Sequence, residues 1–318
     1  MEKREVLIIK TGYSEVLDSS QHLRKTSFGD ILRTTVLLNL YKEDNVTWVT
    51  DKSAFPLLES NPYINELLEL DFTNGMYLLQ KDFDILINLE KDHDICQLAS
   101  MINAWVKYGF RLDKKTNKPE AYDRASEALA VSADIYIKKT NRRQFQELVF
   151  EMVGQTWRGE EYVIGYTPKI NNEYDVALNT IVGPKWPAKA WPIEKWDQLE
   201  QILTKEGLKV TRQDKQNQEI LTNLFLYMDW INSAKLIITN DSLGMHLGLA
   251  FKKKVLAFFS SSHPDEVYFY GRGKPIFTNN PPYCFPCFGS VCKGEKFCLA
   301  DISVEQVYDE VKKLYPKI

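Results

Sequence analysis

An aspartate stands where a helix is expected to begin after the first buried strand. The segment SFGDILRTT, residues 27–35, places Asp30 directly after a glycine that permits a tight turn. Asp30 should fall at the N-cap or in the first turn, where a carboxylate is a favoured cap. The same position would suit a general base, because the helix dipole lowers the pKa of the carboxyl group and keeps it ionised. Position alone leaves both interpretations open.

A second segment combines lysine, tryptophan and proline. VGPKWPAKAWPIEKW, residues 182–196, contains three of each and shows no regular pattern before Pro192, which suits the first turn of a helix. Lys185 and Lys189 precede that helix, where either ammonium group can hold a phosphate or pyrophosphate as a point charge. The structural alternative is a packed aromatic loop that carries solvated lysines.

A third polar group of residues follows a buried strand. KLIITNDSLGMHLGLA, residues 235–250, ends its strand in Asn240, Asp241 and Ser242, and a helix is expected to begin near Gly244. Backbone amides at such a helix start, with a glycine that allows close approach, bind anions. His246 lies one turn into the helix and would donate to a phosphate oxygen. A capped helix with a half-buried histidine is the structural alternative.

Four of the five cysteines lie close together in PPYCFPCFGSVCKGEKFCL, and they are Cys284, Cys287, Cys292 and Cys298. This stretch of turn residues has little apolar content with which to form a core. Four thiolates suit a tetrahedral structural site for zinc or iron, and in a reducing compartment a metal is favoured over disulfides. Four separate thiols, or adventitious disulfides, are the alternative.

The elements that must position these residues alternate between strands and helices. Short buried runs predict strands at Val6–Ile9, Val46–Val49, Ile85–Ile87, Tyr162–Gly165, Val176–Leu178, near Val210, at Leu236–Thr239 and at Val255–Phe259. Helical patterns lie between them, and the last runs from Ser303 to Leu314. This alternation implies parallel sheets with helices on both faces. We therefore predict an α/β fold of two doubly wound domains, residues 1–157 and 158–318.

The first strand is followed by a connection, residues 11–27, that is long for an α/β protein, where such loops typically run about 2–6 residues. A surface excursion would explain it. A binding loop would also explain it, because ligands of open α/β sheets lie outside the carboxyl ends of the strands.

Composition excludes several classes of protein. The 40 basic and 43 acidic residues give a net charge of -3, which lacks the basic excess of a nucleic-acid-binding protein. No apolar run approaches the roughly 18 residues of a membrane span, and the start does not have the pattern of a signal peptide. We expect a cytoplasmic protein, with peripheral contact at the inner face of the membrane left open. The fingerprints of P-loop enzymes, nicotinamide dehydrogenases, serine hydrolases and zincins are absent from the sequence.

Taken in order, VLIIK followed by SFGDILRTT, then KWPAKAWP, then TNDSLGMH resembles glycosyltransferase family 9, the bacterial heptosyltransferases. The resemblance spans nearly the whole chain. It implies a GT-B fold, in which two Rossmann-like domains face each other across a cleft, with the acceptor side in the N-terminal domain. It also implies an inverting transfer, without a catalytic metal ion, of a sugar from a nucleotide donor, most often ADP-heptose, to a hydroxyl of a glycan, a lipopolysaccharide core or a protein.

The resemblance also implies roles for individual residues. Asp30 matches the general base, and Lys189 matches the lysine that neutralises the donor pyrophosphate. The donor site corresponds to Asn240, Asp241, Ser242, Gly244 and His246. The residue that holds the donor ribose is usually acidic in the family, and its position is left open among Gln213, Asp214 and Glu219. The four cysteines are similar to the cysteine-bound iron finger of the autotransporter heptosyltransferase branch.

Two other classes of function remain as alternatives. A GT-B-like sugar-nucleotide epimerase would share the cleft and the anion site, but it would need a different acid/base set and no acceptor. A catalytically silent scaffold that binds sugar nucleotides would keep only the fold. The joint presence of Asp30, Lys189 and His246 argues against the scaffold.

Overall fold

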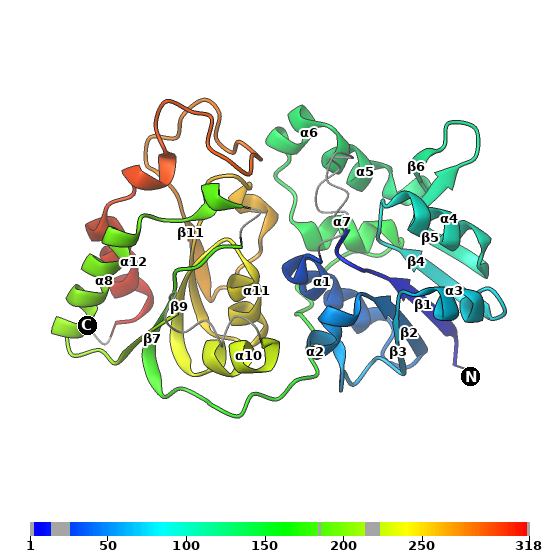
Figure 1. Cartoon of the computed structure of the whole chain (residues 1–318), viewed down its shortest axis with the longest axis horizontal. Coiled ribbons are helices and arrows are strands. Elements are labelled where there is room, and N and C mark those ends of the chain that lie inside the picture. The colour runs from blue at the N-terminus through cyan, green and yellow to red at the C-terminus, as the bar shows by residue number, and fades with distance from the viewer. Residues whose placement is uncertain (1–2, 14–25, 184–185, 214–222, 317–318) are drawn as a thin grey trace. The chain divides into compact units, whose positions relative to one another are not determined.

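The computed structural model describes residues 3–13, 26–183, 186–213 and 223–316. The chain divides into two compact units, Met1–Tyr166 and Thr167–Ile318, which Figure 1 colours from blue to green and from green to red. The sequence placed the boundary between residues 157 and 158. Each unit has its own sheet and is described by itself.

Unit 1 is built on a six-stranded sheet in the order β3-β2-β1-β4-β5-β6, in which only β6 is antiparallel to its neighbour. Its strands are β1 Glu5–Ile9, β2 Asn45–Thr50, β3 Glu66–Glu69, β4 Asp82–Asn88, β5 Asn103–Asp113 and β6 Lys118–Ala121. Its α-helices are α1 Phe28–Thr34, α2 Phe55–Leu58, α3 Phe72–Leu78, α4 His93–Met101, α5 Ser126–Ala133, α6 Ile135–Thr140 and α7 Phe145–Met152. Short 3-10 helices run over Thr35–Leu40, Lys52–Ala54 and Asp123–Ala125.

Unit 2 has a five-stranded, wholly parallel sheet in the order β11-β10-β9-β7-β8. Its strands are β7 Tyr174–Asn179, β8 Val210–Gln213, β9 Ala234–Asn240, β10 Lys254–Phe258 and β11 Gly273–Ile276. Its α-helices are α8 Ile193–Lys205, α10 Leu224–Asn232, α11 Leu243–Ala250 and α12 Val304–Leu314. Short 3-10 helices run over Pro187–Lys189, Pro264–Glu266 and Cys298–Asp301. The α/β fold class predicted from the sequence, two doubly wound parallel sheets, is confirmed.

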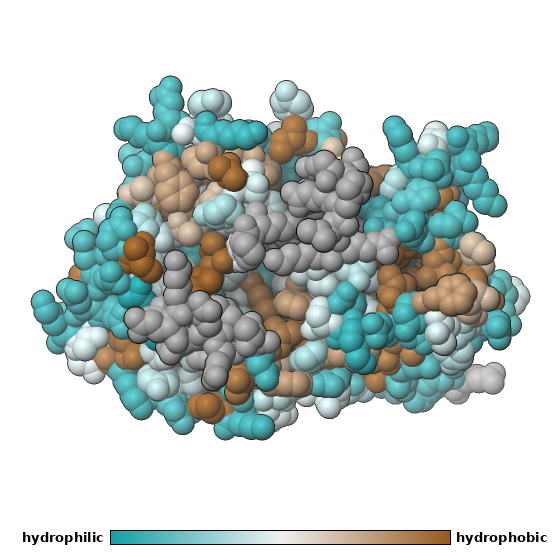
Figure 2. Space-filling view, viewed as in Figure 1, coloured by the Kyte–Doolittle hydropathy of each residue, from teal (hydrophilic) through white to brown (hydrophobic). Residues whose placement is uncertain are grey.

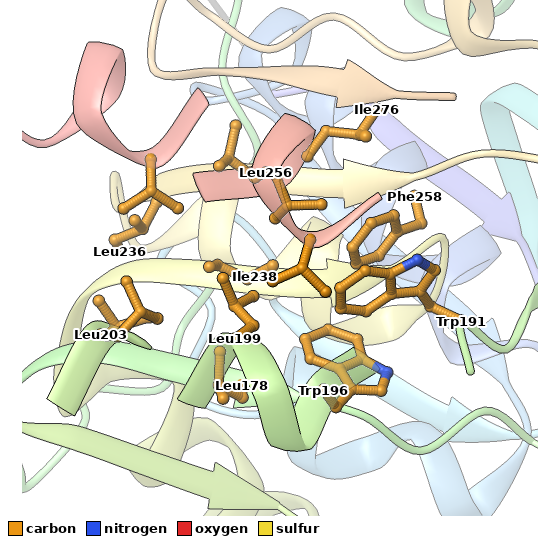
Figure 3. Packing of buried hydrophobic residues seen from close by; sticks show 14 of the residues in the cluster. Leu178, Trp191, Trp196, Leu199, Leu203, Leu236, Ile238, Leu256, Phe258 and Ile276 are labelled. Carbon is orange, nitrogen blue, oxygen red and sulfur yellow. The ribbon is translucent and has the colours of Figure 1, made fainter. Parts of the chain in front are cut away.

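Apolar side chains from the strands and their covering helices form a core in each unit, while the face in Figure 2 is largely hydrophilic with apolar groups interspersed. In unit 2, one side of the sheet packs against α8 and α12 (Figure 3). Trp191 stacks on Phe258 with ring centroids 4.7 Å apart, and Trp196 meets both rings edge-on. The packing of these three rings therefore holds the start of α8 against β10.

The prediction of a strand at Tyr162–Gly165 is wrong, because these residues form no regular element. The segment is held instead by side chains of unit 1. The Val163 N–H donates to the hydroxyl of Thr35 (3.1 Å), and the amide of Asn61 donates to the Val163 carbonyl (2.9 Å). Its apolar, branched residues are typical of a strand, but their burial comes from packing on unit 1.

Each sheet has one point at which the strand order reverses, between β1 and β4 in unit 1 and between β7 and β9 in unit 2. The connections from the two central strands then leave in opposite directions, which opens a crevice at the carboxyl ends of those strands. Polar residues follow β1, β4, β7 and β9 in the sequence, so they gather at these two crevices.

Candidate active site

The crevice of unit 1 holds a buried group of charged side chains. Lys10, just after β1, forms ion pairs with Asp30 on α1 and, at 3.1 Å, with Glu90 just after β4. Arg33 donates to the other oxygen of Asp30 through Nη2 (2.7 Å) and Nε (3.0 Å). Asp30 is 10% exposed at its side chain, and Glu90 is fully buried. The arrangement fixes the largely buried carboxylate of Asp30 between two cations.

These cations decide the charge state of Asp30. Burial alone would raise the pKa of the Asp30 carboxyl, but the charges of Lys10 and Arg33 outweigh it and hold that pKa well below its usual range. Asp30 lies in the first turn of α1 with Ser27 as the N-cap residue. The low pKa keeps Asp30 ionised, and the ion pairs with Lys10 and Arg33 are its main favourable causes.

The sequence interpretation missed Lys10 and Glu90. Glu90 accepts hydrogen bonds from the N–H groups of Thr11 (2.8 Å) and Gly12 (2.7 Å), and so fixes the chain as it leaves β1. The signal was present, because a charged residue follows the buried run that ends in Ile9 and another follows the run that ends in Leu89. Adjacent parallel strands bring such residues to one sheet edge.

Lys91, the neighbour of Glu90, is a half-buried lysine of the same crevice. Burial and the nearby charge of Lys10 lower the pKa of Lys91 to about 8. Its ammonium nitrogen lies 5.0 Å from the centre of the Phe110 ring. Lys91 is therefore a cation that can lose its charge near neutral pH.

The crevice of unit 2 brings together two of the segments singled out from the sequence. The ammonium of Lys189 donates to the carboxylate of Asp241 at 2.6 Å, and the side chains are 13% and 11% exposed. Ser262, beyond β10, donates to the same carboxylate oxygen. Burial would raise the pKa of Asp241, but Lys189 and the hydroxyl of Ser262 lower it overall. A lysine and an ionised aspartate thus form a fixed pair outside β9.

Asn240 and Trp191 hold the lysine-bearing loop in place. The Asn240 amide accepts from the Trp191 N–H (3.2 Å) and donates to the Thr180 carbonyl (3.1 Å). Asn240 is fully buried, so its side chain joins the loop to β7 and β9. Lys185, the other lysine of the loop, lies outside the described residues.

The first turn of α11 lies against the end of β7. Ser242 is the N-cap residue, but its hydroxyl accepts from the Asn179 amide (3.3 Å) and does not cap the helix. A side chain at Gly244 would meet Asn179 Nδ2 at 2.3 Å and the Tyr227 hydroxyl at 2.5 Å, so any larger residue would have to displace these two side chains. His246, buried in the first two turns, lies near enough for its charge to lower the pKa of Asp241.

Of the ribose candidates, Gln213 ends β8 and is fully buried. Neither amide atom of Gln213 has a hydrogen-bond partner in the part of the chain that the structure describes. Asp214 and Glu219 lie outside the described residues, as does most of the long connection over residues 11–27.

The four clustered cysteines have free thiols. A Cβ placed on Gly294 would lie 3.7 Å from the sulfur of Cys284 and 3.8 Å from that of Cys292. Burial and the three other cysteines raise the pKa of Cys298 to about 11, so all four sulfurs interact electrostatically. Across the described ranges, however, no group of three or more His, Cys, Asp or Glu side chains is arranged to hold a metal ion.

The fold and the two crevices define a two-unit α/β protein with a polar site at the switch point of each sheet. The model of "Glycosyltransferase family 9 (heptosyltransferase)" matches residues 221–298, which include the start of α11. The resemblance to glycosyltransferase family 9 that the sequence predicts is thus confirmed.

Three individual proteins are similar to this chain, one in sequence over part of its length and two in fold. The lipooligosaccharide heptosyltransferase 2 of Campylobacter jejuni is 28% identical over 124 residues, which cover 38% of this chain and 37% of that protein's length. The E. coli heptosyltransferase WaaC, solved with ADP-2-deoxy-2-fluoro heptose, has a TM-score of 0.61 at 15% identity over 97% of this chain and 99% of its own. The iron-containing dodecameric glycosyltransferase TibC of enterotoxigenic E. coli has a TM-score of 0.59 at 14% identity over 99% and 77%.

The structural likenesses establish that this chain has the fold of these glycosyltransferases. The descriptions of all three proteins name glycosyltransferases or heptosyltransferases, so the comparisons do not favour the epimerase alternative. Within the described residues, no helix has both the length and the apolar character needed to cross a membrane.

Proposed function

We propose that this chain is a glycosyltransferase of the heptosyltransferase type, which transfers a sugar from a nucleotide donor to an acceptor hydroxyl. The observation that carries the proposal is the Lys189–Asp241 pair beside the start of α11. Asp241 and that helix start lie within the segment that matches the family. A fixed ammonium group beside backbone amides at a helix start suits a pyrophosphate.

Lys189 and the first-turn amides of α11 carry the charge of the departing nucleoside diphosphate. Asp241 is itself anionic, so its role is to hold the Lys189 ammonium in place rather than to contact phosphate. Ser262, beyond β10, donates to the same carboxylate, and the hydrogen bond from the Trp191 N–H to Asn240 holds the lysine-bearing loop in place. Positive charge placed in advance stabilises a leaving group without rearrangement. We expect the transfer to need no catalytic metal ion.

Asp30 takes the proton of the acceptor hydroxyl. The hydroxyl oxygen forms a bond to the anomeric carbon while the bond from that carbon to the pyrophosphate oxygen breaks, and the configuration inverts. The electron pair leaves with the nucleoside diphosphate. The ion pairs with Lys10 and Arg33 keep Asp30 ionised but reduce its basicity, so a change in those contacts on acceptor binding would raise its effectiveness.

ADP-heptose is the favoured donor, because WaaC was solved with an ADP-heptose analogue. The buried amide of Gln213 supports this residue as the group that holds the donor ribose. The acceptor is a hydroxyl of a glycan, a lipopolysaccharide core or a protein. A cytoplasmic location, with or without contact to the inner face of the membrane, stays a prediction.

Ligand-induced stabilisation tests the donor assignment. A thermal-shift panel should contain ADP, UDP, GDP and their sugar nucleotides, since a ligand at 100 times its Kd stabilises by about 2.7 kcal/mol. We expect stabilisation by ADP and ADP-heptose, and transfer of heptose to a lipopolysaccharide core acceptor. Conversion of the sugar nucleotide to an epimer in the absence of an acceptor would overturn the proposed transferase function.

We also propose that Cys284, Cys287, Cys292 and Cys298 hold one structural zinc or iron ion. The sulfurs of Cys284 and Cys292 near Gly294, the electrostatic interaction of Cys298 with the other three cysteines, and the description of TibC as iron-containing support this. Four thiolates would leave no coordination position for chemistry, so the ion would stabilise the 284–298 segment. Elemental analysis after purification without a metal column should find about one ion per chain. Metal-free, folded protein with four titratable thiols there would contradict it.

A further inference from the structure

The strand β5 has an open edge over its first half. β6 pairs only with Phe110–Asp113, and the last contact on that side is the N–H of Tyr122 donating to the Gly109 carbonyl (2.9 Å). Among the residues that the structure describes, no strand pairs with the outer side of Asn103–Tyr108. Every second residue of a strand directs its N–H and C=O groups to a given side, so this edge offers unused backbone donors and acceptors.

The open edge carries apolar side chains on both faces of the sheet. Trp105 is 89% exposed and Val106 is 42% exposed, and consecutive strand residues point to opposite faces. Met101, at the end of α4, is 58% exposed directly before this edge. Figure 2 shows apolar side chains gathered on the side of unit 1 that carries α3 and α4. Natural sheets usually protect a long apolar edge, whereas no strand of the described part of the chain pairs with this one.

No charged side chain of Asn103–Tyr108 extends from the edge to repel a second strand. Its one charged side chain, Lys107, turns away and donates to the carbonyl oxygens of Ala99 (3.1 Å) and Ser100 (3.0 Å) at the end of α4. Asn103 is similarly occupied, because its amide donates to Asp82 at the start of β4. Inward-pointing or outward-pointing lysines are the common device against strand pairing, and here the lysine serves as a helix cap.

We propose that Asn103–Tyr108 pairs with the same segment of a second copy of this chain, antiparallel about a two-fold axis near Trp105 and Val106. Antiparallel pairing of identical strands is self-complementary, because each donor on one copy meets an acceptor on the other. The absence of a free charge on the edge removes the repulsion that two identical strands would otherwise suffer. β6 and α4 limit the paired stretch at its two ends, which fixes the register near its middle.

Sedimentation velocity of the full chain over a wide concentration range tests the proposal. The wild type should form a dimer, and Trp105→Lys and Val106→Lys should each raise its dissociation constant roughly 100-fold or more, since two like charges then meet at the axis. Phe72→Lys on α3 is the matched control, because Phe72 is 84% exposed and lies off the edge. It should leave the dimer intact. Far-ultraviolet circular dichroism verifies that each variant is folded.

A monomeric wild type would overturn the proposal and leave the edge to a strand from another partner. A dimer that persists in folded Trp105→Lys and Val106→Lys would also overturn it, because the contact would then lie elsewhere. Equal weakening by Phe72→Lys would count against strand pairing and favour a broad apolar contact through α3.

Discussion

The ammonium group of Lys189 lies 2.6 Å from the carboxylate of Asp241, which follows it by 52 residues in the sequence. The contact joins the loop before α8 to the end of β9, and so it places a cation beside the helix start of α11. Because the pair is largely buried and ion-paired, the ammonium is already positioned when a donor arrives, and less entropy is lost on binding.

Removal of Lys189 should therefore weaken donor binding. We expect Lys189→Ala to lower the affinity for ADP by roughly 10- to 100-fold and to slow transfer, since it also leaves Asp241 without its cation. Isothermal titration calorimetry with ADP measures this, and Lys185→Ala is the matched control. An equal or larger loss at Lys185 would mean that the other lysine binds the pyrophosphate.

Asp30→Asn should lower turnover by about 10²–10⁴-fold, because the amide cannot accept the acceptor proton. ADP affinity should stay within a few-fold of the wild type. Since the pKa of Asp30 lies well below its usual range, the ionised base should persist across the whole neutral and mildly acidic range. Asp44→Asn, at an ion pair with Arg4 that lies away from Asp30, is the control, because the side chain of Asp44 is about as buried (9% exposed). Near-normal turnover of Asp30→Asn would mean that Asp30 has only a structural role, as an ion-pair partner, and is not the general base.

Glu90→Gln should destabilise the protein by about 2–3 kcal/mol, because it removes one of the two anions that face the buried Lys10. The N–H groups of Thr11 and Gly12 keep an amide oxygen as acceptor, so the loss comes from the charge. Urea unfolding measures it. Glu120→Gln, at an exposed pair with Arg111, should change stability by less than about 1 kcal/mol. Equal effects at the two positions would contradict a special role for Glu90.

Lys91→Met should stabilise the protein at pH 7 by about 1–2 kcal/mol, a value discounted for partial exposure. The pKa of Lys91 falls from 10.5 to about 8 on folding, so the folded state bears a cost while this lysine is protonated. That cost fades as pH rises from 8 to 10.5, so the advantage of the methionine should shrink over this window. Unfolding curves at several pH values test this, and a pH-independent difference would contradict it.

Gly244→Ala should weaken ADP binding and destabilise unit 2, because the added methyl group meets Asn179 and Tyr227 at 2.3 and 2.5 Å. Displacement of packed side chains typically costs about 1–3 kcal/mol. Gly183→Ala is the control, since a Cβ at Gly183 has no atom within 4 Å. Thermal melts with and without ADP separate the two effects. Wild-type behaviour of Gly244→Ala would show that the helix start can shift.

Local pattern predicted much of this fold. The strands around Ile8, Val49, Ile87, Leu178 and Ile238 were recognisable because buried parallel strands are short apolar runs between polar residues. The strand expected at Tyr162–Gly165 failed because the same composition also suits a segment that packs on another part of the chain. Periodicity does not distinguish burial by a sheet from burial by side chains such as Asn61 and Thr35.

The candidate site was predictable where its residues lie in one segment and was missed where they do not. Asp241 and Gly244 follow one strand, so the motif itself points to an anion site. Lys10 and Glu90 lie 80 positions apart, and only the pairing of β1 with β4 brings them together. The pKa of Asp30 shows the same limit in part, because Lys10, the cation that lowers it most, lies outside the helix that carries Asp30 and Arg33.

The segment that follows α7 has a consequence for proteolysis. Residues 161–163 are held by unit 1 through Asn39, Asn61 and Thr35, and the chain is held again at Lys169 and Ile170, by Asp229 and Asn232 of unit 2. Only residues 164–168 lie between the two sets of bonds, and one of them is a proline. Proteases cut chain that can leave the surface and extend through their active sites. The covalent link between the units should therefore resist digestion, and trypsin should not release the two halves as separate fragments.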